Sequence, residues 1–358
     1  MTLADLLDKP QYSLPQADKE AALLSELNAL TARHRAGCPG YARILEVMHP
    51  GFRTARSLEE LPYLPVGLFK SQVLRSVPEE EVWKTLLSSG TTGQRPSTIV
   101  LDRETSQLQT LALSRIMTHV LGPRRLPMIV ADHAGLVKDP RRFNARAAGA
   151  VGMMTFGRDH FHALDEQLEL DRPGLEAFLA RFGGQPFLIF GFTFVVWKHF
   201  LGAIAGTGLD LSQGILVHSG GWKKLVEEAV SPQEFRRRVK AETGLSRIYN
   251  FYGMVEQVGS VFLEGKGGHL YPPSFADVII RDPATLLPLP TGQPGVIQVL
   301  SALPRSYPGH SLLTEDLGVV HHVDGGAGGR LGKAISVLGR LPRAELRGCS
   351  DVVAAQAG

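Results

Sequence analysis

The feature that most constrains the fold is an alternation of short apolar runs with helix-like segments up to about residue 259. The apolar runs have the length and the bounding turn residues of buried strands, and helical patterns such as PGLEAFLARFGG at 173–184 separate them. The strand-like runs are LPMIVAD (126–132), PFLIFG (186–191), GILVHSGG (214–221) and SRIYNFYG (246–253). This alternation predicts an α/β fold in which a mostly parallel sheet is covered by helices.

The pattern changes after about Gly259, where short β-rich runs with Pro-Gly, Asp-Pro and Asp-Gly turns replace the alternation. We therefore predict three parts along the chain. They are a helix-covered α/β core over 1–259, a β-rich antiparallel subdomain over 260–340, and a short hinge and tail over 341–358 that contains Cys349.

The composition excludes several classes of protein. The net charge of +3 over 358 residues is too small to argue for nucleic acid or an anionic membrane as a partner. The most apolar stretch, Phe187 to Trp197, is too short to span a bilayer, and two cysteines do not make a disulfide framework. No basic and apolar leader opens the sequence, so we expect a cytoplasmic protein with access to ATP.

One loop, LLSSGTTGQRPSTIV at 86–100, is crowded with hydroxyls and glycines. Small residues let the backbone approach a ligand closely, and hydroxyls with backbone N–H groups suit an anion with many oxygens. The loop therefore indicates a phosphate cradle, although a plain hairpin could have the same composition. The candidate residues are Ser88, Ser89, Gly90, Thr91, Thr92 and Gly93.

Three further segments carry candidate residues, each of them weak evidence alone. NFYGMVEQ places Tyr252, Gly253 and Glu256 at the end of a strand. LLTEDLG places Asp316 before a glycine, and LGRLPRAELRG places Arg340 near the C-terminus. A strand-end tyrosine usually packs, a turn glutamate is often solvated, and TEDLG could be a simple hairpin.

Together and in this order, the four segments resemble the core motifs of the adenylate-forming superfamily of acyl ligases, from about Leu61 to Cys349. The resemblance implies ATP and Mg²⁺ as cofactors. It also implies the fold of the large N-terminal domain of that superfamily, with helix-covered sheets, a β-rich subdomain and a truncated C-terminal domain.

The resemblance also implies a role for each matching residue. The hydroxyl loop would wrap the triphosphate, Tyr252 and Gly253 would lie at the adenine, and Glu256 would bind Mg²⁺. Asp316 would bind both ribose hydroxyls, and Arg340 would reach the ribose or mark the hinge. HSGGWKK at 218–224, which contains Gly220 and Gly221, stands where the superfamily has a glycine-rich strand end against adenine.

These residue types suit the chemistry. Attack of a carboxylate on the α-phosphate brings two anions together, so the site must supply a cation and hydrogen-bond donors. A carboxylate such as Glu256 can hold Mg²⁺, and a carboxylate such as Asp316 can accept two hydrogen bonds from a ribose diol.

Two departures narrow the resemblance. Val255 stands where the motif has threonine, which removes a hydroxyl near the α-phosphate. The sequence also stops just after the hinge motif, so we expect the mobile domain with its catalytic lysine to be absent. Lys223 or Lys224 could supply the cation, although a surface lysine is the favoured interpretation.

Both departures favour one branch of the superfamily, the acyl-protein synthetases. The chain is similar to these long-chain-fatty-acid–protein ligases of the bacterial luminescence fatty acid reductase, which lack the full C-terminal domain. That family reads YGMVEQ and GGWK much as this sequence does. The resemblance implies transfer of the acyl group from acyl-AMP to a cysteine near the C-terminus and then to a reductase partner. Cys349, close to Arg343 and Arg347, is the predicted acceptor, whereas Cys38 is predicted to be structural.

Four histidines need an interpretation. His218 precedes SGGW and could act in the site, but a packed strand histidine is the more common case. His310, His321 and His322 lack metal-ligand spacing, so we predict no metal there.

The substrate is the least constrained part of the prediction. Phe190, Phe192, Phe194 and Trp197 could line a pocket for an alkyl chain or an aryl acid, or could belong to the core. We predict a ligase that activates a carboxylic acid, with a fatty acid favoured, and transfers it to a thiol for an acyl reductase or acyltransferase partner. The alternatives are adenylation of an aryl acid in a natural-product pathway and a degenerate adenylate-binding protein. An oligomer is compatible with the sequence.

Overall fold

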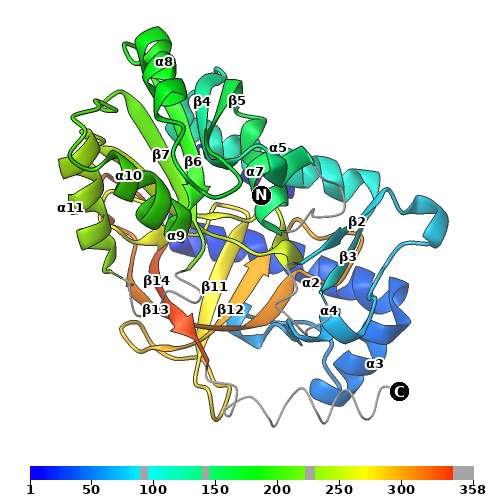
Figure 1. The fold of residues 1–358 in the computed structure, drawn as a ribbon. Coiled ribbons are helices and arrows are strands. Elements are labelled where there is room, and N and C mark those ends of the chain that lie inside the picture. The colour runs from blue at the N-terminus through cyan, green and yellow to red at the C-terminus, as the bar shows by residue number, and fades with distance from the viewer. Residues whose placement is uncertain (89–95, 139–144, 222–229, 342–358) are drawn as a thin grey trace. The chain divides into compact units, whose positions relative to one another are not determined.

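The computed structural model describes residues 1–88, 96–138, 145–221 and 230–341 (Figure 1). The chain forms two compact units. One is Met1–Ile116 together with the segment that starts at Gly253, and the other is Met117–Tyr252. The three domains that the sequence pattern predicts, 1–259, 260–340 and 341–358, stay a prediction.

The unit Met117–Tyr252 is built on a parallel sheet in the order β8–β7–β6–β4–β5, with β4 to β7 side by side in Figure 1. Its strands are β4 (Leu126–His133), β5 (Gly157–Leu164), β6 (Phe187–Phe192), β7 (Gly214–Ser219) and β8 (Arg247–Tyr252). Its helices are α6 (Gly135–Lys138), α7 (Ala145–Met154), α8 (Arg172–Phe182), α9 (Thr193–Val195), η4 (Val196–Leu201), α10 (Gly202–Ile204) and α11 (Pro232–Thr243).

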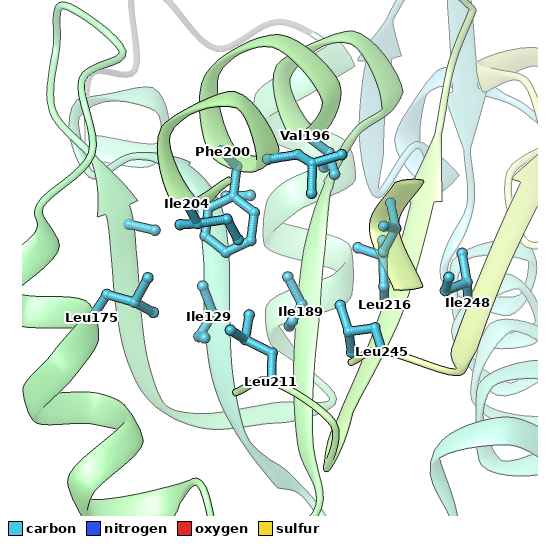
Figure 2. Packing of buried hydrophobic residues seen from close by; sticks show 14 of the residues in the cluster. Ile129, Leu175, Ile189, Val196, Phe200, Ile204, Leu211, Leu216, Leu245 and Ile248 are labelled. Carbon is cyan, nitrogen blue, oxygen red and sulfur yellow. The ribbon is translucent and has the colours of Figure 1, made fainter. Parts of the chain in front are cut away.

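Alternate strand residues bury an apolar layer between this sheet and its helices. Figure 2 shows Val196, Phe200 and Ile204 pointing from the helical segment that follows β6 toward the strands. On the strands they meet Ile129, Ile189 and Leu216, among others (Figure 2). Because successive residues of a strand face opposite sides, Phe190 and Phe192 lie on the other face of β6 from Ile189.

The first unit is dominated by an antiparallel sheet in the order β11–β12–β13–β14–β10–β9, to which β1 adds in parallel along β13. Its strands are β1 (Leu64–Pro65), β9 (Phe262–Glu264), β10 (Leu270–Tyr271), β11 (Ala276–Arg281), β12 (Gly295–Ser301), β13 (Ser311–Val323) and β14 (Lys333–Arg340). A separate antiparallel pair joins β2 (Lys84–Leu87) and β3 (Thr98–Leu101).

The helices α1 to α4 precede the β2–β3 hairpin, and α5 follows it. They are α1 (Leu3–Asp8), α2 (Gln16–Gly37), α3 (Pro39–Met48), α4 (Leu68–Ser71) and α5 (Arg103–Leu121), with short turns η1 (Leu58–Glu60), η2 (Glu79–Glu81) and η6 (Val255–Gln257). Asp102 caps α5, as its position before the helix predicts, because its Oδ1 accepts the Thr105 N–H at 2.7 Å. No helix among the described residues is long and apolar enough to cross a membrane.

The expected alternation of strands and helices is confirmed, and so is the antiparallel pairing after residue 259. The sequence patterns missed β5, whose run GRDHFHAL is too polar to read as a buried strand. They also missed α7, whose alanines and glycines show little amphipathic contrast.

A buried ion cluster attaches α2 to the antiparallel sheet. Asp277 on β11 is fully buried and lies 3.5 Å from Lys333 Nζ and 4.0 Å from Lys19 Nζ. Burial alone would raise the pKa of Asp277, but Lys333 and Lys19 hold that pKa below its ordinary value. Gln16 donates to Oδ2 of Asp277 at 2.6 Å, so the carboxylate has the partners that a buried charge requires.

A second buried polar group involves two histidines. His34 on α2 is fully buried, and its two ring nitrogens lie 2.8 Å from Ser76 Oγ and 3.1 Å from the Pro304 carbonyl. The ring of His310 is 5.0 Å from that of His34, and His310 Nε2 lies 2.9 Å from Thr31 Oγ1. Burial lowers the pKa of His34 to about 3 and takes the pKa of His310 well below 6.5, so both rings are neutral in the folded protein.

These depressed pKa values make stability fall on acidification. Below the ordinary pKa of 6.5 the unfolded chain binds a proton that His34 does not accept in the folded state. Each such histidine should lower the free energy of unfolding by about 1.4 kcal/mol per pH unit. We expect His34→Asn to be less stable than wild type near neutral pH, but to lose stability less steeply in urea unfolding between about pH 6.5 and about pH 5.

The control is Ser76→Ala, which removes the hydrogen-bond partner of His34 Nδ1 without removing a titrating group. It should lower stability by a similar amount at every pH. Identical pH slopes for wild type and His34→Asn would contradict this interpretation of the buried histidines.

Candidate active site

The hydroxyl-rich loop connects β2 and β3. Leu87 pairs with Thr98, and the ladder is extended when the Ser88 N–H donates to the Ser97 carbonyl at 3.0 Å. Ser88 Oγ accepts the Ser97 N–H at 2.8 Å, so this hydroxyl closes the base of the loop. Ser89, Gly90, Thr91, Thr92 and Gly93 lie outside the described residues.

The carboxyl ends of β7 and β8 carry the residues predicted to meet adenine. Gly220 follows β7 with φ at +86°, a conformation that strongly favours glycine. Among the described residues, nothing lies within 4 Å of a Cβ placed on Gly221, so none of them covers the backbone there. Tyr252 is the last residue of β8 and is half-buried. A bare backbone and an aromatic ring at adjacent strand ends suit a flat base.

His218 is a packed residue of the core. It is buried on β7, its Nδ1 lies 2.9 Å from Thr193 Oγ1, and its ring stacks on Phe235 with centroids 4.5 Å apart. Burial, with a smaller contribution from the charge of Arg236, lowers the pKa of His218 to about 3. The neutral, packed ring joins the start of α9 to β7.

Glu256 lies on the turn η6, and a hydrogen bond to its backbone carbonyl fixes its position. Its side chain is buried, and its carbonyl accepts the Tyr307 hydroxyl at 2.9 Å. Burial and the charge of Glu256 raise the pKa of Tyr307, so the phenol keeps its proton and remains a donor. Gln257 adds a hydrogen bond from Nε2 to the Gly309 carbonyl at 2.8 Å. The turn is therefore fixed to the segment before β13.

Asp316 and Arg340, far apart in the sequence, are brought together by strand pairing. They lie opposite each other in the β13–β14 register, and Arg340 Nε is 3.5 Å from Asp316 Oδ1. The ladder shifts register directly afterwards, between Leu317 and Gly318. A Cβ on Gly318 would stand 2.6 Å from Ile297, so only glycine allows this close approach.

Within the first unit, β1 and α4, which precede the β2–β3 hairpin, contact both the region of Glu256 and the region of Asp316. β1 runs along β13, with Leu64 opposite Leu312, and α4 follows it. Phe69 packs edge-on against Tyr307 at 6.1 Å, while Lys70 Nζ lies 3.9 Å from Oε1 of Glu315, the residue before Asp316. Sequence reasoning missed Tyr307, because its contact with Glu256 joins loops that no local pattern connects.

A buried ion pair at the end of β4 was also missed. Asp132 is buried and accepts two hydrogen bonds from Arg146 of α7, each 2.6 Å long, to its two carboxylate oxygens. The guanidinium lies over the ring of Phe194 at 5.8 Å. The signal available in the sequence was the aspartate at the carboxyl end of an apolar run, where parallel sheets place functional groups.

The four aromatic residues considered for the substrate pocket divide into two pairs. Phe190 and Trp197 are buried in the core of the second unit, and Trp197 stacks on Phe235 at 5.7 Å. Phe192 and Phe194 are half-buried. Only the second pair has surface available for a ligand.

The remaining histidines occupy two separate places. His310 packs on His34, whereas His321 and His322 lie beside His269, with ring centroids 4.3 and 5.8 Å away. Within the part of the chain that the structure describes, no three histidine, cysteine or acidic side chains are arranged to hold a metal ion. Cys349, Lys223, Lys224 and Arg343 lie outside the described residues.

Each unit, taken by itself, has residue types that suit part of a complex of a nucleotide with a hard cation. Glu256 offers carboxylate oxygens, the ligand type that Mg²⁺ prefers. In the same unit, Asp316 with Arg340 offers an acceptor and a donor side by side, which suits a ribose. In the unit Met117–Tyr252, Gly220 and Gly221 offer backbone that a flat base could approach.

Sequence comparison decides the family. The family model of the acyl-protein synthetases, LuxE, matches residues 23–357. The chain belongs to the acyl-protein synthetase family. Two curated relatives are both long-chain-fatty-acid–luciferin-component ligases. The Vibrio harveyi protein is 23% identical over 349 residues, covering 91% of this chain and 88% of that protein. The Aliivibrio fischeri protein is 22% identical over 278 residues, covering 75% and 71%.

Structural comparison gives the fold of this acyl-protein synthetase. 2-Hydroxyisobutyryl-CoA ligase, solved with 2-HIB-AMP and CoA in its thioesterification state, superposes with a TM-score of 0.67 at 19% identity. The match covers 92% of this chain and 70% of that protein. The open conformation of the same ligase gives a TM-score of 0.65 at 19% identity, covering 92% and 76%. The predicted α/β fold of the adenylate-forming ligases is confirmed.

The pairing across β13 and β14 makes a testable prediction about nucleotide binding. Asp316→Asn keeps the shape of the side chain but removes the charge that accepts hydrogen bonds most strongly. We expect ATP to bind about tenfold more weakly, the usual loss for a hydrogen bond to a charged group, as measured by calorimetry with Mg²⁺ present.

The matched control is Glu315→Gln, a neighbouring acid on the same strand whose carboxylate is directed to Lys70 instead. It should bind ATP as wild type does. An equal loss in both variants would indicate a general effect of charge on the strand and would contradict a specific role for Asp316.

Proposed function

We propose that the protein activates a long-chain fatty acid with ATP and Mg²⁺ and then carries the acyl group as a thioester on Cys349. The observation that supports this best is the pairing of Asp316 with Arg340 across β13 and β14, in a chain that belongs to the acyl-protein synthetase family. The pairing brings together, from motifs that are distant in the sequence, the carboxylate and the guanidinium that we propose bind the ribose.

In the first step a carboxylate oxygen of the acid attacks the α-phosphorus of ATP, and pyrophosphate leaves. Both reactants are anions, so the site must lower their repulsion. Glu256 would hold Mg²⁺, which supplies positive charge at the phosphates when bound. Asp316 and Arg340 would orient the ribose, Tyr252 and the backbone at Gly220 and Gly221 would hold adenine, and the hydroxyl-rich loop would donate to the triphosphate.

In the second step the Cys349 thiolate attacks the acyl carbonyl. The carbon–sulfur bond forms, the carbon–oxygen bond to the phosphate breaks, and AMP leaves with the electron pair. The thiol proton goes to solvent or to a basic group. The thioester preserves the activation for a partner protein, an acyl reductase or an acyltransferase.

The names of the two curated relatives include a long-chain fatty acid, and that supports a fatty acid over an aryl acid. The two half-buried aromatic residues at the end of β6 support an apolar acid of either kind. We propose that the reaction takes place in the cytoplasm, where ATP and reduced thiols are available.

The first test is ATP–pyrophosphate exchange at fixed Mg²⁺ with saturated acids of graded length and with several aryl acids. We expect exchange to be fastest with a long-chain acid, because activation of the acid and release of pyrophosphate are reversible on the enzyme. Exchange with aryl acids alone would contradict the fatty-acid substrate. Nucleotide binding without exchange for any acid would indicate a protein that binds adenylates and does not turn over.

A second test addresses the acceptor. After incubation with ATP and a radiolabelled fatty acid, wild type should retain label through denaturation, and hydroxylamine should release it, as expected of a thioester. Cys349→Ala should lose the label and keep pyrophosphate exchange.

The control is Cys38→Ser, at the only other cysteine of the sequence. Cys38 is buried, and its sulfur accepts the Tyr41 N–H at the start of α3, a role that serine can fill. Cys38→Ser should label as wild type does. Label that persists in Cys349→Ala would overturn the assignment of Cys349.

A further inference from the structure

The order of the parallel strands marks one topological switch point in the second unit. The connection after β4 leads through α7 to β5 on one side, whereas the connection after β6 leads through α9 and α10 to β7 on the other. Connections that leave adjacent strands in opposite directions open a crevice between their carboxyl ends, and ligands of parallel sheets bind there. Here the two ends are Asp132–His133 and Phe192.

The chemistry of the proposed reaction places the acid beside this crevice. An acyl adenylate joins the acid directly to the α-phosphate, so the acyl pocket must begin next to the nucleotide. Phe192 pairs with Ser219 across β6 and β7, and its Cδ1 lies 3.3 Å from the position of a Cβ on Gly220. Gly220 is among the residues that we propose for the nucleotide, so Phe192 lies beside the proposed nucleotide site.

The two half-buried aromatics at this edge differ in what covers them. Phe194 has the guanidinium of Arg146 over its ring, and Asp132 holds that guanidinium in place with two hydrogen bonds. Phe192 packs edge-on against Phe190, with ring centroids 5.8 Å apart, and also lies close to two glycines. A Cβ on Gly149 of α7 would stand 3.2 Å from Phe192 Cζ, closer than ordinary van der Waals contact. A side chain at position 149 or 220 would therefore require the ring of Phe192 to shift by a few tenths of an ångström.

We propose that Phe192, seated against Gly149 and Gly220, sets the length of acid that the enzyme accepts. This inference rests on the proposed function and names the residue that bounds its apolar substrate. The ring closes the space beside α7, so a smaller residue at 192 opens room for a longer chain. A methyl at 149 pushes the ring off α7 and into the crevice, which shortens the space.

The helix α7 supplies a matched pair of variants. Gly149 and Gly152 lie on the same helix, and a Cβ on Gly152 would meet no atom of the described residues within 4 Å. Gly149→Ala and Gly152→Ala therefore change helix propensity alike, and only the first reaches Phe192. Each variant is compared with wild type by pyrophosphate exchange over saturated acids of graded length, after thermal unfolding has shown that it folds.

We expect opposite shifts from the two sides of the contact. Phe192→Ala should raise the ratio of exchange with longer over shorter acids by about tenfold, a common effect of one methylene in an apolar pocket. Gly149→Ala should lower the same ratio, and Gly152→Ala should leave it unchanged. In the double variant Gly149→Ala/Phe192→Ala the methyl no longer has a ring to displace, so the effect of Gly149→Ala should disappear.

Different results would contradict the role of Phe192 and the proposed function. If wild type exchanges with fatty acids but Phe192→Ala leaves the length profile unchanged, or Gly149→Ala and Gly152→Ala behave alike, this inference is overturned and the proposed function stands. If wild type exchanges with no acid, the proposed function fails and the inference fails with it. Should Phe192→Ala not fold, Phe192→Leu replaces it with the same expected direction.

Discussion

The hydrogen-bonded ladder of β13 is the constraint on which the first unit depends. This strand, Ser311–Val323, pairs with β12 and β14 and receives β1 along its first half. A strand paired in this way cannot slip by one residue without turning its buried face outward. Asp316 is thereby fixed opposite Arg340, and the ladder shifts its register directly beside them, between Leu317 and Gly318, before the pairing continues to Val323.

The other candidate acid depends on the same region through a longer chain of contacts. Tyr307 precedes β13, donates to the Glu256 carbonyl and packs against Phe69, which follows β1. A buried phenol that is left without an acceptor costs about 1–3 kcal/mol, so this arrangement resists change. Glu256 and Asp316 are therefore positioned by one continuous set of packed residues, although they come from separate motifs.

In the second unit, the two faces of a parallel sheet have different surroundings. Its apolar layer lies on the face of β6 that carries Ile189, and this layer fixes the sheet (Figure 2). The alternation of strand side chains then leaves Phe190 and Phe192 on the opposite face, and burial decreases toward the carboxyl end. The core and the proposed substrate wall are thus two faces of one strand. Asp132 with Arg146 supplies the charged boundary nearby, held at the end of β4.

The sequence by itself determined the strands and helices, because period-two and period-3.6 patterns, turn residues and caps such as Asp102 act over a few positions. It also determined the family, because FYGMVEQ, TEDLG and LGR occur in a recognisable order. Only the tertiary structure decided which candidates meet and which are merely buried. It paired Asp316 with Arg340, gave Glu256 its contact with Tyr307, and made His218 and Phe190 core residues while leaving Phe192 half-exposed. The reason is that burial and side-chain contact come from strand register and from packing between distant segments, which no local pattern encodes.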